Sequence, residues 1–177
     1  TGEPLLDPAT QRRFDDGHRF EALARPLAEK IIGEDLYPVT GCKGELSASF
    51  DGLTLMEDVA FEHKTLSASL ADVLHPDCKG FELPLQYRVQ MEQQLMVCGG
   101  DRVLFTAATK DGSDVRRCWY TSDATLRAEI LAGWKQFDAD LKTYVPAAAV
   151  EKVVAEPVEA LPAPVVQVTG QIALQDN

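Results

Sequence analysis

A helix-like segment near the middle of the chain, residues 83–98, separates two groups of strand-like segments. Gly99-Gly100 closes it, because glycine readily adopts the left-handed conformation that ends many helices. The flanking β-like segments are residues 36–39, 45–50 and 59–64 before it, and residues 102–109 and 114–121 after it. The last two are joined by Lys110-Asp111-Gly112-Ser113, which is typical of a hairpin.

Further helices are predicted toward both ends of this pattern. Apolar residues recur at helical spacing from Asp7-Pro8 to Gly33, with an interruption expected at Pro26. A short helix is predicted at residues 66–74, and a long amphipathic helix runs from Ser122 or Asp123 to near residue 144. The order of elements predicts an α+β fold, a central mixed β-sheet flanked by helices.

The composition changes after Val145. Residues 146–177 are rich in Ala, Val, Pro and Glu, and their prolines oppose regular structure. We therefore expect one domain over residues 1–145, followed by a linker or tail over residues 146–177.

The net charge of −11 excludes nucleic-acid binding through overall charge, because affinity for phosphates comes from Lys and Arg that displace counterions. A role on nucleic acid must rest on a local basic patch or on bound metal ions. No apolar run approaches the roughly 20 residues that span a bilayer, so no membrane association is expected.

The residues that indicate chemistry are Asp51, Glu62 and Lys64. Glu62 and Lys64 project from the same face of a strand because side chains alternate. Asp51-Gly52 has turn chemistry, and a hairpin would bring the Asp51 carboxylate beside Glu62. Adjacent carboxylates repel unless a cation such as Mg²⁺ or Mn²⁺ lies between them. Such a metal activates water and stabilises charge on a phosphodiester, with the lysine orienting the water. The alternative is a solvated strand with a chance salt bridge.

Two helices carry further polar candidates. Glu21 lies on the first helix, where the alternative is a surface glutamate. Residues at helical spacing on the segment 83–98 form an amide face that could orient water or DNA, or could simply be solvated. They are Gln86, Gln90, Gln93 and Gln94.

These pieces together resemble a known nuclease family. The pattern is Gly17-x-x-x-Glu21-x-x-Ala24-Arg25, Ser-Phe-Asp51-Gly-Leu, Glu62-His-Lys64 and Tyr87-x-x-Gln90-x-x-x-Gln94-Leu95. In this order and spacing, over residues 12–145, it is similar to the YqaJ-like viral recombinases. That family includes bacteriophage lambda exonuclease and belongs to the PD-(D/E)XK superfamily, so the resemblance implies a restriction-endonuclease-like core.

The resemblance also implies residue roles. Asp51 and Glu62 would be metal ligands, with the backbone carbonyl of His63 as another and Lys64 as the catalytic lysine. Glu21 falls at an acidic or histidine metal-ligand position of the family. Gln90 falls on its active-site glutamine, with Gln94 beside it. The family has a DNA-end-holding segment before this helix, which is either missing here or part of a longer chain. Candidate substitutes for its phosphate contacts are Arg12, Arg13 and Arg19, for which the alternative is exposed helix arginines without such a role.

The implied function is metal-dependent exonuclease digestion of linear double-stranded DNA, from 5′ to 3′, in phage-type homologous recombination. The implied partners are DNA ends, a single-strand annealing protein and a homotrimer of the chain itself. The implied location is the cytoplasm of a bacterial host, with a phage or prophage gene. The alternatives are another PD-(D/E)XK nuclease, either an endonuclease or a Cas-type exonuclease, and a catalytically silent DNA-binding or assembly module.

Overall fold

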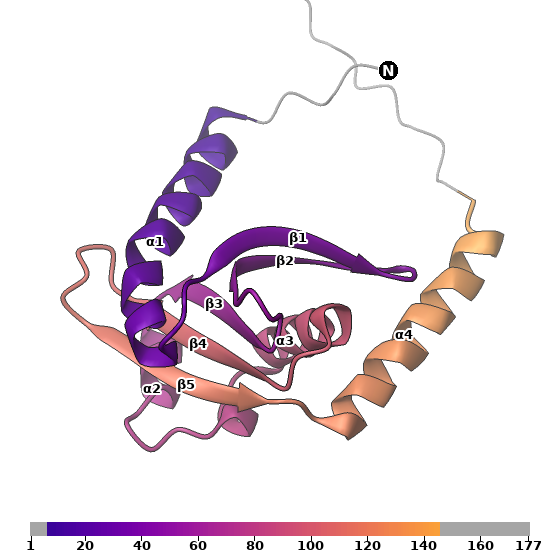
Figure 1. Cartoon of the computed structure of the whole chain (residues 1–177). Helices are drawn as coiled ribbons and strands as arrows, with labels where there is room; N and C mark the ends of the chain where they lie inside the picture. The colour runs from indigo at the N-terminus through magenta and orange to yellow at the C-terminus, as the bar shows by residue number, and fades with distance from the viewer. Residues whose placement is uncertain (1–6, 146–177) are drawn as a thin grey trace, which may run out of the picture. The chain divides into compact units, whose positions relative to one another are not determined.

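The computed structural model describes residues 7–145, so the predicted tail at 146–177 lies outside the described residues. The fold below belongs to the first of two units, Thr1–Thr143. Its sheet has five strands in sequence order, with β3 and β4 parallel and the other neighbours antiparallel (Figure 1). The strands are β1 (Tyr37–Lys43), β2 (Leu46–Leu53), β3 (Val59–Thr65), β4 (Arg102–Ala108) and β5 (Val115–Thr121).

Helices pack on both faces of this mixed sheet. They are α1 (Pro8–Ile32), α2 (Ala68–Val73), a 3₁₀ turn (Gly80–Glu82), α3 (Leu85–Cys98) and α4 (Ala124–Thr143). The connection between the parallel strands β3 and β4 contains α2, the 3₁₀ turn and α3, because parallel neighbours need a long crossover. The predicted fold class, an α+β mixed sheet flanked by helices, is confirmed.

The alternation of side chains along β4 divides the core in two. Val103 and Phe105 join the large core cluster with Met91 and Leu95 of α3. Leu104 turns to the opposite face, into a smaller cluster that includes residues of α1. Because β3 alternates in the same way, its polar residues near the carboxyl end are also divided between the α3 side and the α1 side.

Two local expectations are wrong. Asp51 and Gly52 form no turn and lie within β2. Gly52 serves close packing instead, since an added Cβ would lie 2.9 Å from the Leu36 Cβ and 3.3 Å from the Phe61 ring. α1 is one continuous helix through Pro26 rather than an interrupted one. Pro26 is on the exposed side, where water can bond the carbonyl that loses its helical partner.

The predicted apolar face of α4 is only partly covered. Leu126 is buried, whereas Trp134 and Phe137 are 44% and 53% exposed. No helix within residues 7–145 has the length and apolar character to cross a bilayer.

Candidate active site

The predicted carboxylates meet where β2 separates from β3. The pairing of these strands is limited to Gly52 with Phe61 and Leu53 with Ala60. One residue before this pairing, the Asp51 carboxylate takes the place of a backbone acceptor and receives the N–H of His63 at 2.7 Å. Where the strands separate, the side chains of Asp51 and Glu62 lie close enough to interact electrostatically. The sequence pattern predicts such a pair of neighbouring carboxylates.

Glu62 is almost completely buried, at 1% exposure. Its carboxylate accepts hydrogen bonds from Gln90 Nε2 at 2.6 Å and from Gln94 Nε2 at 2.6 Å, and it forms an ion pair with Lys64 Nζ. Donors from α3 and β3 therefore hold both oxygens in place. Such a fixed carboxylate has little freedom to adapt, which suits a metal ligand.

The charges at the split strongly perturb Asp51. Burial, followed by the negative charge of Glu62, raises the pKa of Asp51 to about 7. Burial alone would lower the pKa of Lys64. The charge of Glu62 and the hydrogen bond to it, together with Asp51 and Glu21, hold that pKa above its ordinary value. Lys64 is therefore a charged group with its ammonium held at the carboxylates.

The His63 ring faces away from the carboxylates. Its Nδ1 lies 2.8 Å from Thr106 Oγ1 on β4. Burial, and then the charge of Lys64, lowers the pKa of His63 to about 4, so the ring is neutral at pH 7. The His63 backbone contacts the site through its N–H, which donates to Asp51, and the role of its carbonyl as a metal ligand stays a prediction.

Glu21 is half-buried on α1, and its charge contributes to raising the pKa values of both Asp51 and Lys64. The structure thus brings Glu21 to the edge of the site without a hydrogen bond to the other site residues. Across residues 7–145, no three His, Cys, Asp or Glu side chains are grouped tightly enough to hold a metal by themselves. The role of Glu21 as a ligand stays a prediction.

Two observations bear on a cation at this position. The negative charge of Glu62 helps to raise the pKa of Asp51, so the two carboxylates repel one another, and paired carboxylate oxygens fit a hard divalent cation and its waters. Gln94 is 1% exposed and uses Nε2 to bond both Ser49 O and Glu62. Within the part of the chain that the structure describes, its buried Oε1 has no hydrogen-bond partner, which is costly for an acceptor.

The predicted phosphate contacts are less closely connected to this site. Arg12 and Arg19 are exposed on α1, and the Arg19 guanidinium lies 5.4 Å from the centre of the Phe20 ring. In the described part of the chain, neither bonds a site residue. The Arg13 side chain lies outside what the structure describes.

Sequence reasoning missed the role of Arg25, whose Nε donates to the carbonyl of Asp51 at 3.0 Å. The signal was available, since Arg25 follows Glu21 by four residues and so shares its face of α1. Gln93 was assigned to a face that could orient water or DNA. It instead donates to the carbonyl of Ser47 at 2.8 Å.

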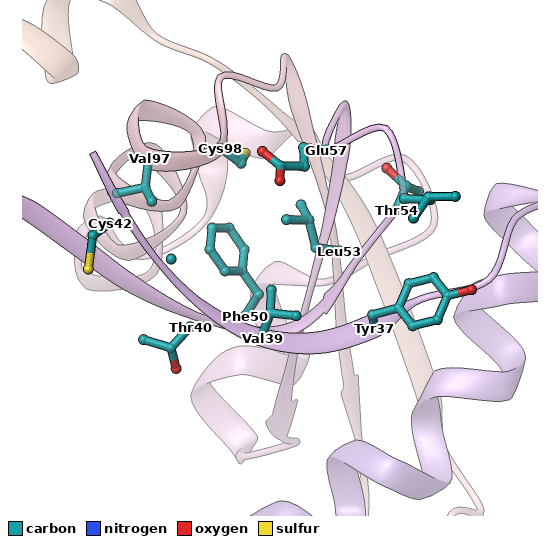
Figure 2. Close-up of a pocket in the computed structure, with 12 residues that line it drawn as sticks. Tyr37, Val39, Thr40, Cys42, Phe50, Leu53, Thr54, Glu57, Val97 and Cys98 are labelled. Atoms are coloured by element: carbon teal, nitrogen blue, oxygen red, sulfur yellow. The ribbon is translucent and has the colours of Figure 1, made fainter. Parts of the chain in front are cut away.

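A separate pocket of 490 Å³ lies between β1, β2 and the end of α3 (Figure 2). Phe50, Leu53 and Val97 contribute apolar walls, and Glu57 is the only charged residue in its lining. None of the predicted site residues lines this pocket. It lacks the paired carboxylates and the lysine, so the chemistry is assigned to the strand split.

Comparison with solved structures places this arrangement in a known fold. Two solved structures share this mixed sheet flanked by helices. One is the crystal structure of an alkaline exonuclease, LHK-Exo, from Laribacter hongkongensis, with a TM-score of 0.57 and 22% identity over 71% of this chain and 66% of that chain. Another is LHK-Exo in complex with dAMP, with a TM-score of 0.61 and 22% identity over 80% of this chain and 72% of that chain.

At this level of identity the likeness establishes the fold. In the first comparison the match spans just under two thirds of the exonuclease's own length. No family model matches the chain. No curated protein matches it either.

Proposed function

We propose that this chain is a metal-dependent deoxyribonuclease that degrades linear double-stranded DNA from its ends. The observation that carries the proposal is the site at the strand split. There a buried Glu62 is held by two glutamines and Lys64, next to an Asp51 whose pKa is raised to about 7. The fold shared with an alkaline exonuclease supports the same conclusion.

Asp51 and Glu62 would hold the divalent cation, Mg²⁺ or Mn²⁺, with the His63 carbonyl as a further ligand. When bound, the cation lowers the pKa of a water molecule and stabilises charge on the phosphodiester. Lys64 presents its ammonium at the same carboxylates, where it can orient the attacking water or stabilise the developing negative charge. Gln90 and Gln94 keep Glu62 in a single orientation.

The acidic charge of the protein suggests that the cation contributes to DNA binding as well as to hydrolysis. With a net charge of −11, the chain repels the DNA backbone at long range. A cation between the carboxylates and a phosphate replaces this repulsion by attraction. Arg12, Arg13 and Arg19 are the proposed additional phosphate contacts, with Gln94 acting mainly on Glu62.

Finer features follow from the resemblance to the YqaJ-like recombinases and remain part of the proposal. They are 5′ to 3′ polarity, a role in phage-type recombination beside a single-strand annealing protein, assembly as a homotrimer, and a cytoplasmic location in a bacterial host.

The direct test uses one plasmid in two forms, linearised and covalently closed, incubated with the protein and Mg²⁺, Mn²⁺ or EDTA. We expect loss of the linear form alone, and only with metal. Blocking one 5′ end with phosphorothioate linkages should protect the strand that begins there. Cleavage of the closed circles would indicate an endonuclease, and no digestion of either form would leave the silent DNA-binding module.

The matched variants are Asp51→Asn and Asp35→Asn, which remove one carboxylate charge each. Asp35 is exposed, between α1 and β1, and lies outside the proposed site. We expect Asp51→Asn to lower the cleavage rate by at least about 10²-fold, as expected for loss of a charge-stabilising group, whereas Asp35→Asn retains it. Equal activity of the two variants would contradict the assignment of the site.

A further inference from the structure

Three backbone carbonyls of β2 accept hydrogen bonds from side chains of the flanking helices. They belong to Ser47, Ser49 and Asp51. β3 pairs with β2 at Gly52 and Leu53, so all three residues lie beyond the pairing of these two strands.

The donors come from both α3 and α1. Gln93 and Gln94 of α3 donate to the carbonyls of Ser47 and Ser49, at 2.8 Å and 2.9 Å. Arg25 of α1 donates through Nε to the carbonyl of Asp51, at 3.0 Å. The backbone of β2 is therefore bonded by side chains of two helices, and the bond from Arg25 falls on the residue that carries the carboxylate.

We propose that Arg25 is a positioning residue, which fixes the Asp51 backbone so that its carboxylate stays at the strand split and faces Glu62. This inference rests on the proposed metal-dependent function. Arg25 acts through a hydrogen bond to one carbonyl, and its positive charge is secondary. Asp51 is thus bonded at two points, its backbone carbonyl to Arg25 and its carboxylate to the His63 N–H. Loss of the Arg25 bond would leave only the bond to the carboxylate.

Two substitutions separate the hydrogen bond from the charge. Glutamine has its Nε2 bonded to Cδ, the same position that Nε occupies in arginine, so Arg25→Gln keeps a donor to Asp51 and loses the charge. Arg25→Met has similar length and neither property. Lys30→Met, on the exposed surface of the same helix, is the control for loss of a positive charge from α1.

The measurements are the dissociation constant for Mn²⁺ by titration calorimetry without DNA, and the backbone amide resonance of His63 in the metal-free protein. We expect Arg25→Met to weaken Mn²⁺ binding about tenfold, as for the loss of one hydrogen bond, and to shift the His63 resonance. Arg25→Gln and Lys30→Met should stay within about twofold of the unmodified protein.

A purely structural role would lower the melting temperature and leave both the Mn²⁺ affinity and the His63 resonance of the folded protein unchanged, which would overturn the inference. Equal weakening in Arg25→Gln and Arg25→Met would also overturn it, because charge would then be the operative property. If the unmodified protein bound no Mn²⁺, the proposed function would fail. The His63 resonance would still decide whether Arg25 positions Asp51.

Discussion

At the scale of single residues, the repulsion between the two carboxylates destabilises the metal-free protein. Asp51 shares the split between β2 and β3 with a buried Glu62, and its pKa is raised to about 7. A carboxyl group whose pKa is raised on folding stabilises least when it is ionised. Its contribution is complete below the unfolded-state pKa near 3.8 and is lost as the pH rises through about 7.

Asp51→Asn should therefore stabilise the metal-free protein while it abolishes cleavage. At pH 8 in EDTA we expect the free energy of unfolding to increase by about 1–3 kcal/mol, because the asparagine removes the repulsion and retains an acceptor for the His63 N–H. At pH 4 the gain should vanish. Urea unfolding at both pH values measures it, and a loss of stability at pH 8 would contradict the electrostatic account.

Gly52 gives a second prediction at this scale. Because a Cβ at this position would lie 2.9 Å from the Leu36 Cβ, Gly52→Ala should push β2 away from its neighbours and destabilise the protein by about 1–3 kcal/mol. Gly112 has open space around an added Cβ but a φ of +72°, so it is no neutral control. Gly133, which has no atom within 4 Å, is the suitable comparison. Equal melting temperatures for Gly52→Ala and Gly133→Ala would contradict the packing argument.

The gathering of these charged side chains was predictable at this scale, and its backbone setting was not. The spacing Asp51, Glu62 and Lys64 was enough to predict a carboxylate pair beside a lysine. The dipeptide Asp51-Gly52 suggested a turn, because aspartate and glycine favour turns. Both residues also occur in strands, where the structure needs a carboxylate or where a neighbouring side chain packs directly against the backbone. That need depends on Leu36 and Phe61, which lie far from Gly52 in the sequence.

At the scale of elements, α3 connects the candidate active site to the helix that follows the sheet. Its Gln90 and Gln94 hold Glu62, and its Glu92, fully buried, holds the beginning of α4. Glu92 accepts from Tyr120 Oη at 2.7 Å, Asp123 N at 2.8 Å and Arg127 Nε at 2.7 Å. Burial acts to raise the pKa of Glu92, but these bonds together hold it below its usual range.

Glu92→Gln should destabilise the protein by about 2–4 kcal/mol at pH 7, because the amide puts a donor against donors and leaves Arg127 without its ion pair. A carboxyl group with a lowered pKa stabilises above its unfolded-state value, near 4.5, and loses that contribution as the pH falls. The difference between variant and unmodified protein should thus shrink below pH 4.5. Urea unfolding across this range tests it.

Glu129→Gln, at an exposed position of α4, is the matched control and should change stability by less than about 0.5 kcal/mol. A deficit in Glu92→Gln that stayed constant down to pH 3 would show that the ionised carboxylate has no special role.

The elements themselves followed well from local patterns, whereas their junctions did not. The periodicity of residues 83–98 predicted α3. It could not predict which glutamine of this helix bonds to β2 and which bonds to β3. Gln93 and Gln94 are adjacent in sequence, but one bonds Ser47 and the other bridges Ser49 and Glu62. To predict these hydrogen-bond partners, one needs the distance between α3 and the sheet. The spacing of residues along a helix does not give that distance.

At the scale of the whole molecule, the negative charge constrains the proposed binding of DNA. The net charge of −11 opposes association with a polyanion, and the exposed arginines of α1 are few. We expect affinity for a blunt duplex to rise at least about tenfold when Ca²⁺ replaces EDTA, because Ca²⁺ uses similar oxygen ligands and usually supports little hydrolysis. Fluorescence anisotropy with a labelled duplex measures this change.

The control for that experiment is Glu62→Gln, which should lose the Ca²⁺-dependent part of the affinity. Binding that was equally tight in EDTA would contradict a metal-mediated contact and would favour a basic surface elsewhere on the molecule.

The split between β2 and β3 is the proposed metal site, and its occupancy can be observed by anomalous diffraction from crystals grown with Mn²⁺. We predict one strong anomalous peak bonded to carboxylate oxygens of both Asp51 and Glu62, absent in Asp51→Asn. A peak at other residues, or none at Mn²⁺ concentrations that support DNA cleavage, would contradict the account.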